Sequence, residues 1–205
     1  PSAWLVGGLV VGHALISRVR FEFAGGYVVP EQLVLVPLML LGPLNLVPLL
    51  IALSGTLALI PDLARGSWSR DRWLNPLSEH WCYVAPVLIL AALAPGEPTL
   101  DEWPAYVLAL AAQLGADFAS AALRNKLLDE VPLREFAIGF VGASRVELIL
   151  SPTAFVATLV AVEQPIVLIL VFAPLVWMLD NFSKERWARH AGALELNRAY
   201  RGTVM

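Results

Sequence analysis

Long apolar runs alternate with short polar connectors along this chain of 205 residues. A helix needs roughly 20 apolar residues to cross a bilayer core about 30 Å thick, and somewhat fewer where neighbouring helices shield it. The runs that approach this length cover residues 1–17, 46–60, 81–93, 103–123, 149–162 and 166–179. The pattern therefore predicts an all-α fold, a polytopic transmembrane helical bundle.

The first run, residues 1–17, contains no charged residue and ends before Arg18 and Arg20. A signal peptide would have the same apolar character, but no basic segment precedes the run and further spans follow it. We therefore interpret it as a transmembrane helix. A mature protein seldom starts inside such a run, so we also expect residues upstream of Pro1.

The stretch after this first run is not a simple span. Charged and apolar positions alternate over residues 19–23, Gly25 and Gly26 follow, and Pro30 precedes an apolar stretch. Glycine gives the backbone freedom and proline disfavours helix in the residue before it, so we expect an extended entry and then a short helix over residues 31–41. This helix either crosses the membrane or re-enters it, which leaves six or seven membrane segments.

Local signals mark three later parts of the chain. Thr99 and Glu102 have the spacing of a capping box, which predicts a helix start there. Residues 133–148 contain four charged residues and suit an amphipathic helix at the membrane interface better than a span. Residues 163–165 provide the turn of a final membrane hairpin.

Composition agrees with a membrane protein. Hydrophobic residues make up 58% of the chain and charged residues 15%, whereas soluble proteins average about 45–50% and about 25%. Abundant Leu, Val and Ala exclude a disordered chain, and a single cysteine, Cys82, excludes a disulfide scaffold. The net charge of −3 provides no basic surface for nucleic acid, so the expected partner is the lipid bilayer.

The basic residues indicate the orientation through the positive-inside rule. Seven crossings with the C-terminus inside place all 14 Lys and Arg residues on the cytoplasmic side, and the connectors 42–45, 95–102 and 163–165 contain none. We therefore expect a multi-pass protein with a cytoplasmic C-terminus. Five tryptophans lie near the ends of predicted spans, as an aromatic belt requires: Trp68, Trp73, Trp81, Trp103 and Trp177.

A candidate intramembrane polar site lies on the fifth span. Gln113, Asp117 and Ser120 are spaced by four and three residues, which places them on one helix face. Polar groups inside a membrane require partners, so these side chains either face a central cavity or have a structural role. In the structural interpretation Asp117 neutralises a basic partner such as Arg145 or hydrogen-bonds a neighbouring helix. Arg145 and Glu147 complete the candidate site, and a structural role for this pair is the favoured interpretation.

Three histidines and Cys82 are the only soft metal ligands, and no spacing among them supports a metal or haem site. His13 and His80 fall near the inner ends of two spans, so a bis-histidine site is geometrically possible, with satisfied interfacial histidines as the alternative. Gly8 and Gly12 have the spacing of a close helix contact, within the monomer or between monomers. No catalytic motif, metal site or cofactor site is recognised in the chain.

The C-terminal part changes character after Asp180. Residues 182–200 are charged and helix-compatible, and no stop signal precedes Met205. We divide the chain into a transmembrane sensory or anchor domain, residues 1–181, and a cytoplasmic linker helix, residues 182–205. This linker is expected to lead into a further domain and to form a homodimer, with a basic helix resting on anionic lipid as the alternative.

Two segments carry a family resemblance. The junction Leu194-Glu195-Leu196-Asn197-Arg198-Ala199-Tyr200-Arg201-Gly202-Thr203-Val204-Met205 and the stretch Phe21-Glu22-Phe23-Ala24-Gly25-Gly26-Tyr27-Val28-Val29-Pro30 resemble the membrane module of actinobacterial HD-GYP-type proteins. Those enzymes hydrolyse cyclic di-GMP, so the resemblance implies a bacterial cytoplasmic membrane and a full-length, metal-dependent phosphohydrolase. The family's His-Asp pair and Gly-Tyr-Pro motif have no counterpart in this chain.

Two functions are compatible with these observations. The first is a sensory or anchoring module that couples to a cytoplasmic HD-type phosphohydrolase and responds to an unidentified small-molecule signal. The second is a self-contained membrane protein for small-molecule binding or transport, similar to the substrate-binding subunits of vitamin uptake systems.

Overall fold

The computed structural model describes residues 2–19, 21–23, 26–66, 80–94, 96–128, 132–178 and 181. These residues are mainly helical, with one short β-hairpin. The elements, in chain order, are α1 (Ala3–Ile16), β1 (Phe21–Phe23), β2 (Gly26–Val28), α2 (Gln32–Leu41), η1 (Leu44–Leu46), α3 (Val47–Ala64), η3 (His80–Tyr83), α5 (Val84–Leu93), η4 (Leu100–Glu102), α6 (Trp103–Leu128) and α7 (Leu133–Ala161), followed by a helix over Ile166–Met178.

Within the described residues, three helical segments are long and apolar enough to cross a membrane: Leu44–Ala64, Leu100–Lys126 and Leu133–Ala161. Four shorter apolar helices, of 10–17 residues, accompany them: Ala3–Ile16, Gln32–Leu41, His80–Leu93 and Ile166–Met178. The sequence pattern predicted a helix at each of these positions. Length and composition alone therefore identify three possible spans, fewer than the six or seven that the pattern predicted.

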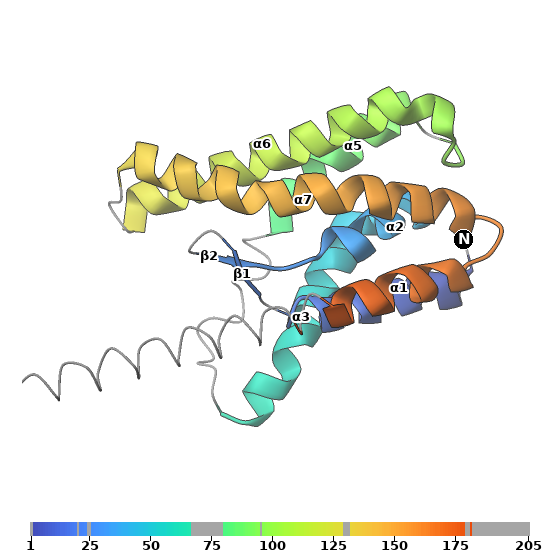
Figure 1. The fold of residues 1–205 in the computed structure, drawn as a ribbon, viewed down its shortest axis with the longest axis horizontal. Coiled ribbons are helices and arrows are strands. Elements are labelled where there is room, and N and C mark those ends of the chain that lie inside the picture. The colour runs from blue at the N-terminus through green and yellow to red at the C-terminus, as the bar shows by residue number, and fades with distance from the viewer. Residues whose placement is uncertain are drawn as a thin grey trace, which may run out of the picture.

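The short helix α2 lies at the centre of the fold (Figure 1) and packs against α1 on one side and α7 on the other. The side chains of Leu33, Leu35 and Leu38 are fully buried. A helix that is apolar on all sides needs to be surrounded, and α2 meets that condition because α5, α6 and α7 form one group and α1 and α3 another. This central position makes α2 a wall of any cavity between the two groups.

The predicted extended entry to α2 is a β-hairpin. β1 and β2 pair antiparallel, with Phe21 opposite Val28 and Phe23 opposite Gly26. Pro30 and Glu31 then lead into α2, whose first residue is Gln32. The alternation of residues 19–23 was therefore a valid strand signal.

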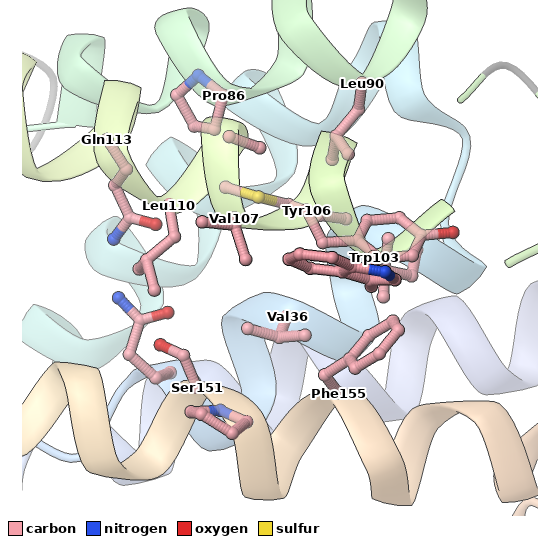
Figure 2. Close-up of a pocket in the computed structure, with 15 residues that line it drawn as sticks. Val36, Pro86, Leu90, Trp103, Tyr106, Val107, Leu110, Gln113, Ser151 and Phe155 are labelled. Atoms are coloured by element: carbon pink, nitrogen blue, oxygen red, sulfur yellow. The ribbon is translucent and has the colours of Figure 1, made fainter. Parts of the chain in front are cut away.

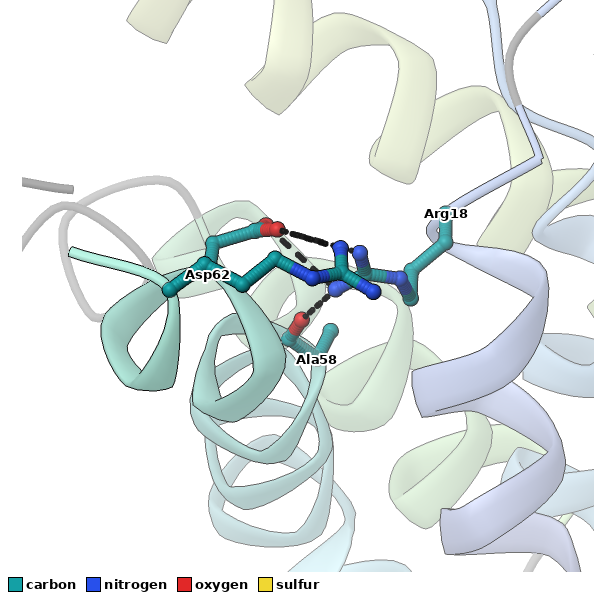
Figure 3. A network of polar contacts seen from close by, with 4 residues as sticks. Arg18, Ala58 and Asp62 are labelled. Atoms are coloured by element: carbon teal, nitrogen blue, oxygen red, sulfur yellow. Dashed lines mark hydrogen bonds and ion pairs between the residues drawn. The ribbon is translucent and has the colours of Figure 1, made fainter. Parts of the chain in front are cut away.

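The C-terminal ends of α1 and α3 are joined by the side chain of Arg18 (Figure 3). Its guanidinium donates to both carboxylate oxygens of Asp62, at 3.1 and 3.3 Å, and to the backbone carbonyl of Ala58. Arg65 approaches the same carboxylate at 3.8 Å. These contacts hold the C-terminal ends of α1 and α3, with Arg18 and Arg65, at the same end of the molecule.

Two sequence predictions are wrong in detail. Residues 133–148 and 149–161 belong to one continuous helix, α7. No helix-breaking residue stands where the two predicted segments meet, at Leu148 and Ile149. The capping box at Thr99 is not formed: Thr99 precedes a 3-10 turn and makes no side-chain cap. Glu102 accepts a hydrogen bond from the Tyr106 hydroxyl at 2.9 Å instead, and Thr99 donates to that hydroxyl through its backbone N–H.

Several predictions fall on residues outside the described ranges. They concern the linker helix over residues 182–205, the junction over residues 194–205, Trp68, Trp73 and His190. These stay predictions.

Candidate functional site

A pocket of about 150 Å³ lies between α2, α5, α6 and α7 (Figure 2). Branched apolar side chains from α2, α5 and α6 form its walls, among them Val36, Leu90 and Val107. Two prolines, Pro86 and Pro152, complete the apolar surface. No lining residue in the part of the chain that the structure describes is charged, so the pocket suits an apolar guest.

One end of the pocket is polar. Gln113 and Ser151 lie together at this end in Figure 2, on α6 and α7. Gln32, from the first turn of α2, also lines the pocket and has no solvent exposure. Gln113 is 5% exposed. Two buried amides in an otherwise apolar wall can fix the orientation of a bound molecule through hydrogen bonds.

The Gln32 amide is satisfied on one side only. Its Nε2 donates to Oε2 of Glu147 at 3.3 Å, across 115 residues of sequence. Its Oε1 is buried and has no hydrogen-bond partner among the described residues. A buried acceptor without a partner is unfavourable by about 1–3 kcal/mol. A donor on a bound molecule would remove this penalty.

The other end of the pocket is aromatic. Trp103, Tyr106 and Phe155 lie together there in Figure 2. The rings of Tyr106 and Phe155 are 4.6 Å apart between centroids and inclined by 48°, and the Tyr106 hydroxyl is held by Glu102. Aromatic faces fixed in this way favour a planar guest.

A group of carboxylates lies beyond the polar end. Glu31 accepts a hydrogen bond of 2.6 Å from the hydroxyl of Tyr83. Glu147 lies within electrostatic range of Glu31 and Asp117, and Asp117 also of the Cys82 thiol. Asp117 is half-buried. The polar face predicted on the fifth span therefore has acidic neighbours from α2 and α7.

The five predicted site residues separate into four groups. Gln113 lines the pocket, while Ser120 is buried outside the lining and accepts a hydrogen bond of 3.1 Å from the indole of Trp81. Asp117 and Glu147 belong to the carboxylate group. Arg145 is exposed, and within the described ranges it makes no ion pair with Asp117 or Glu147.

Sequence reasoning missed Gln32 and the aromatic end of the pocket. Gln32 is a neutral polar residue next to Glu31 inside an apolar stretch, which is a usable signal because such a residue needs a partner in a membrane. Trp103 was interpreted as part of an aromatic belt, and its 57% exposure is compatible with that role as well.

The histidines in the last turn of α1 and at the start of η3 approach each other. His13 is fully buried, its Nδ1 lies 2.7 Å from the hydroxyl of Ser54, and its ring centroid is 6.5 Å from that of His80. No group of three or more His, Cys, Asp or Glu side chains within the described residues could hold a metal ion.

Comparison with known proteins gives no relative. No family model matches the chain, and no curated protein or solved structure matches it either.

Proposed function

We propose that this chain is a polytopic membrane module that binds a small, mainly apolar molecule in the pocket between α2, α5, α6 and α7. The observation that supports this best is the presence of two buried amides, Gln32 and Gln113, in the lining of an uncharged, apolar pocket. Such a combination is typical of ligand sites, because apolar walls supply affinity and a few polar groups supply specificity.

The proposal includes the topology. Six or seven membrane segments cross the bacterial cytoplasmic membrane, with the C-terminus in the cytoplasm. Its support is the distribution of charge: α6 ends near Arg124 and Lys126 at the left of Figure 1, where α7 begins. The right of Figure 1 holds the start of α6 and the end of α7, next to Glu102 and Glu163. The gathering of basic residues at the end where α6 finishes and α7 begins agrees with the positive-inside rule.

We also propose that ligand binding in the pocket is transmitted to the C-terminal part of the chain. Ser151 and Phe155 place the pocket on α7, and a turn over residues 162–165 joins α7 to the helix Ile166–Met178, which leads to the predicted linker. A ligand that binds one packing state of α7 more tightly would shift the position of this last helix. The resemblance of residues 194–205 supports a cytoplasmic HD-type phosphohydrolase as the proposed receiver, paired through the linker as a homodimer.

A self-contained binding or transport protein is the second candidate. The pocket favours it to the extent that the lining residues in the described part of the chain all precede residue 156. Both candidate functions use the same pocket. They differ in whether ligand binding there controls a further domain.

A pair of variants on α6 tests the binding of an apolar molecule in the pocket, which both candidate functions require. Ala109 lines the pocket and is 5% exposed, whereas Ala111, two residues later, is exposed. Ala109→Phe should fill the pocket and abolish binding of an apolar probe such as 4-bromotoluene to the chain in lipid nanodiscs. Ala111→Phe should leave binding unchanged. Equal binding by both variants would contradict the proposed site.

The same pair separates the two candidates in cells. If the module controls a phosphohydrolase, cellular cyclic di-GMP should differ between Ala109→Phe and Ala111→Phe. No difference, together with a reading frame that does not continue into a His-Asp domain, would favour the self-contained protein.

A further inference from the structure

We infer that the pocket selects an uncharged, ring-sized molecule that carries an O–H or N–H donor, a compound of the phenol type, and that Gln32 Oε1 accepts its hydrogen bond. This inference rests on the proposed function and adds the chemical class of the ligand.

The orientation of the Gln32 amide follows from its neighbour. The Nε2 group faces the carboxylate of Glu147 at 3.3 Å, and the reverse orientation would place Oε1 against a carboxylate oxygen. Two acceptors in contact repel each other, so Oε1 points away from Glu147 and is buried without a partner among the described residues. Because Gln32 lines the pocket, its Oε1 is an acceptor that the pocket offers to a ligand, beside the amide of Gln113.

The side chains of the pocket walls indicate that the ligand is uncharged. The described lining residues include no Lys, Arg, Asp or Glu. An ion would lose its hydration on entry without meeting a lining charge, which is strongly unfavourable. The Glu147 carboxylate behind Gln32 further disfavours an anion. The donor must therefore be neutral.

The volume of the pocket and the residues at its two ends indicate the size and shape of the ligand. A cavity of about 150 Å³ is sufficient for one benzene ring. Tyr106 and Phe155 provide inclined aromatic faces at one end, and Gln32 and Gln113 provide amides at the other. A ring with a single donor satisfies both ends. One water molecule could also satisfy Oε1, but it would leave the apolar walls without contacts.

Two probes of matched shape test the inference. 4-Bromophenol and 4-bromotoluene share a ring and a bromine atom and differ only in a hydroxyl against a methyl group. Bromine quenches tryptophan fluorescence at short range, and Trp103 lines the pocket. Binding is measured with the 205-residue chain in nanodiscs, with each probe's partitioning into protein-free nanodiscs subtracted. The part of the quenching that Trp103→Phe removes is assigned to the pocket.

The expected result is tighter binding of 4-bromophenol, by roughly tenfold, which is the usual effect of one buried hydrogen bond. Gln32→Leu should abolish the difference between the probes and retain binding of 4-bromotoluene. Equal binding of both probes by the unmodified chain would overturn the donor assignment and leave the proposed function standing. Binding of neither probe would overturn the proposed site itself, and this comparison requires no variant to fold.

Discussion

The hydroxyl of Tyr83 donates a hydrogen bond of 2.6 Å to Oε1 of Glu31, across 52 residues of sequence. Tyr83 is 5% exposed and immediately precedes α5, and Glu31 immediately precedes α2. The contact therefore joins the beginnings of two helices that form the pocket, and it fixes the residue next to Gln32.

Tyr83→Phe should destabilise the protein by about 1–3 kcal/mol, because the substitution removes one donor from a carboxylate in a partly buried position. Thermal or denaturant unfolding in detergent measures the change. Tyr106→Phe is the matched control: its hydroxyl also donates to a carboxylate, Glu102, but Tyr106 is less buried. A smaller loss for Tyr83→Phe than for Tyr106→Phe would contradict the structural role of the first bond.

Ser54→Ala should also destabilise the protein, by about 1–3 kcal/mol, because it leaves Nδ1 of the fully buried His13 without its partner. The control is Thr56→Ser on the same helix, where the hydroxyl bonds only to the backbone carbonyl of Ala52 and the substitution retains it. The control should change the free energy of unfolding by well under 1 kcal/mol. Similar losses for both variants would indicate that the His13 contact adds nothing to stability.

The orientation is testable with single cysteines, because the native Cys82 is buried and 2% exposed. Glu163 and Lys126 are both exposed and lie at opposite ends of the helices. A membrane-impermeant maleimide should label Glu163→Cys in intact cells, and it should label Lys126→Cys only after the membrane is opened. The reverse pattern would invert the proposed topology.

The sequence was sufficient for the positions of the helices but not for their surroundings. Residues 31–41 were recognised as a short apolar helix, yet periodicity could not place that helix at the centre of the fold, because a uniformly apolar segment has no face that points to its neighbours. The pairing of Gln32 with Glu147 was equally hidden, since the two residues are 115 positions apart. Spacing along one helix did place Gln113 and Ser120 on a buried face.

The charged residues of α7 are a second case in which the sequence did not predict the neighbours of a side chain. Arg145 and Glu147 were interpreted as a structural pair, but two positions along a helix are about 200° apart around its axis, so their side chains leave it in different directions. Arg145 is exposed, while Glu147 faces inward to Gln32. The two residues therefore have separate roles, and only Glu147 can affect the pocket.

Glu147→Leu should weaken the selectivity of the pocket because Glu147 is a positioning residue for Gln32. Without the carboxylate at 3.3 Å, the Gln32 amide can rotate and present Nε2 to the pocket instead of Oε1. The preference for 4-bromophenol over 4-bromotoluene should then fall several-fold, while binding of 4-bromotoluene should stay the same. Glu147→Gln should restore much of the preference, since its amide oxygen can accept the same hydrogen bond. Arg145→Leu, two residues away and exposed, should leave both probes unaffected. Loss of 4-bromotoluene binding in Glu147→Leu would show that the residue supports the shape of the pocket rather than the orientation of the amide.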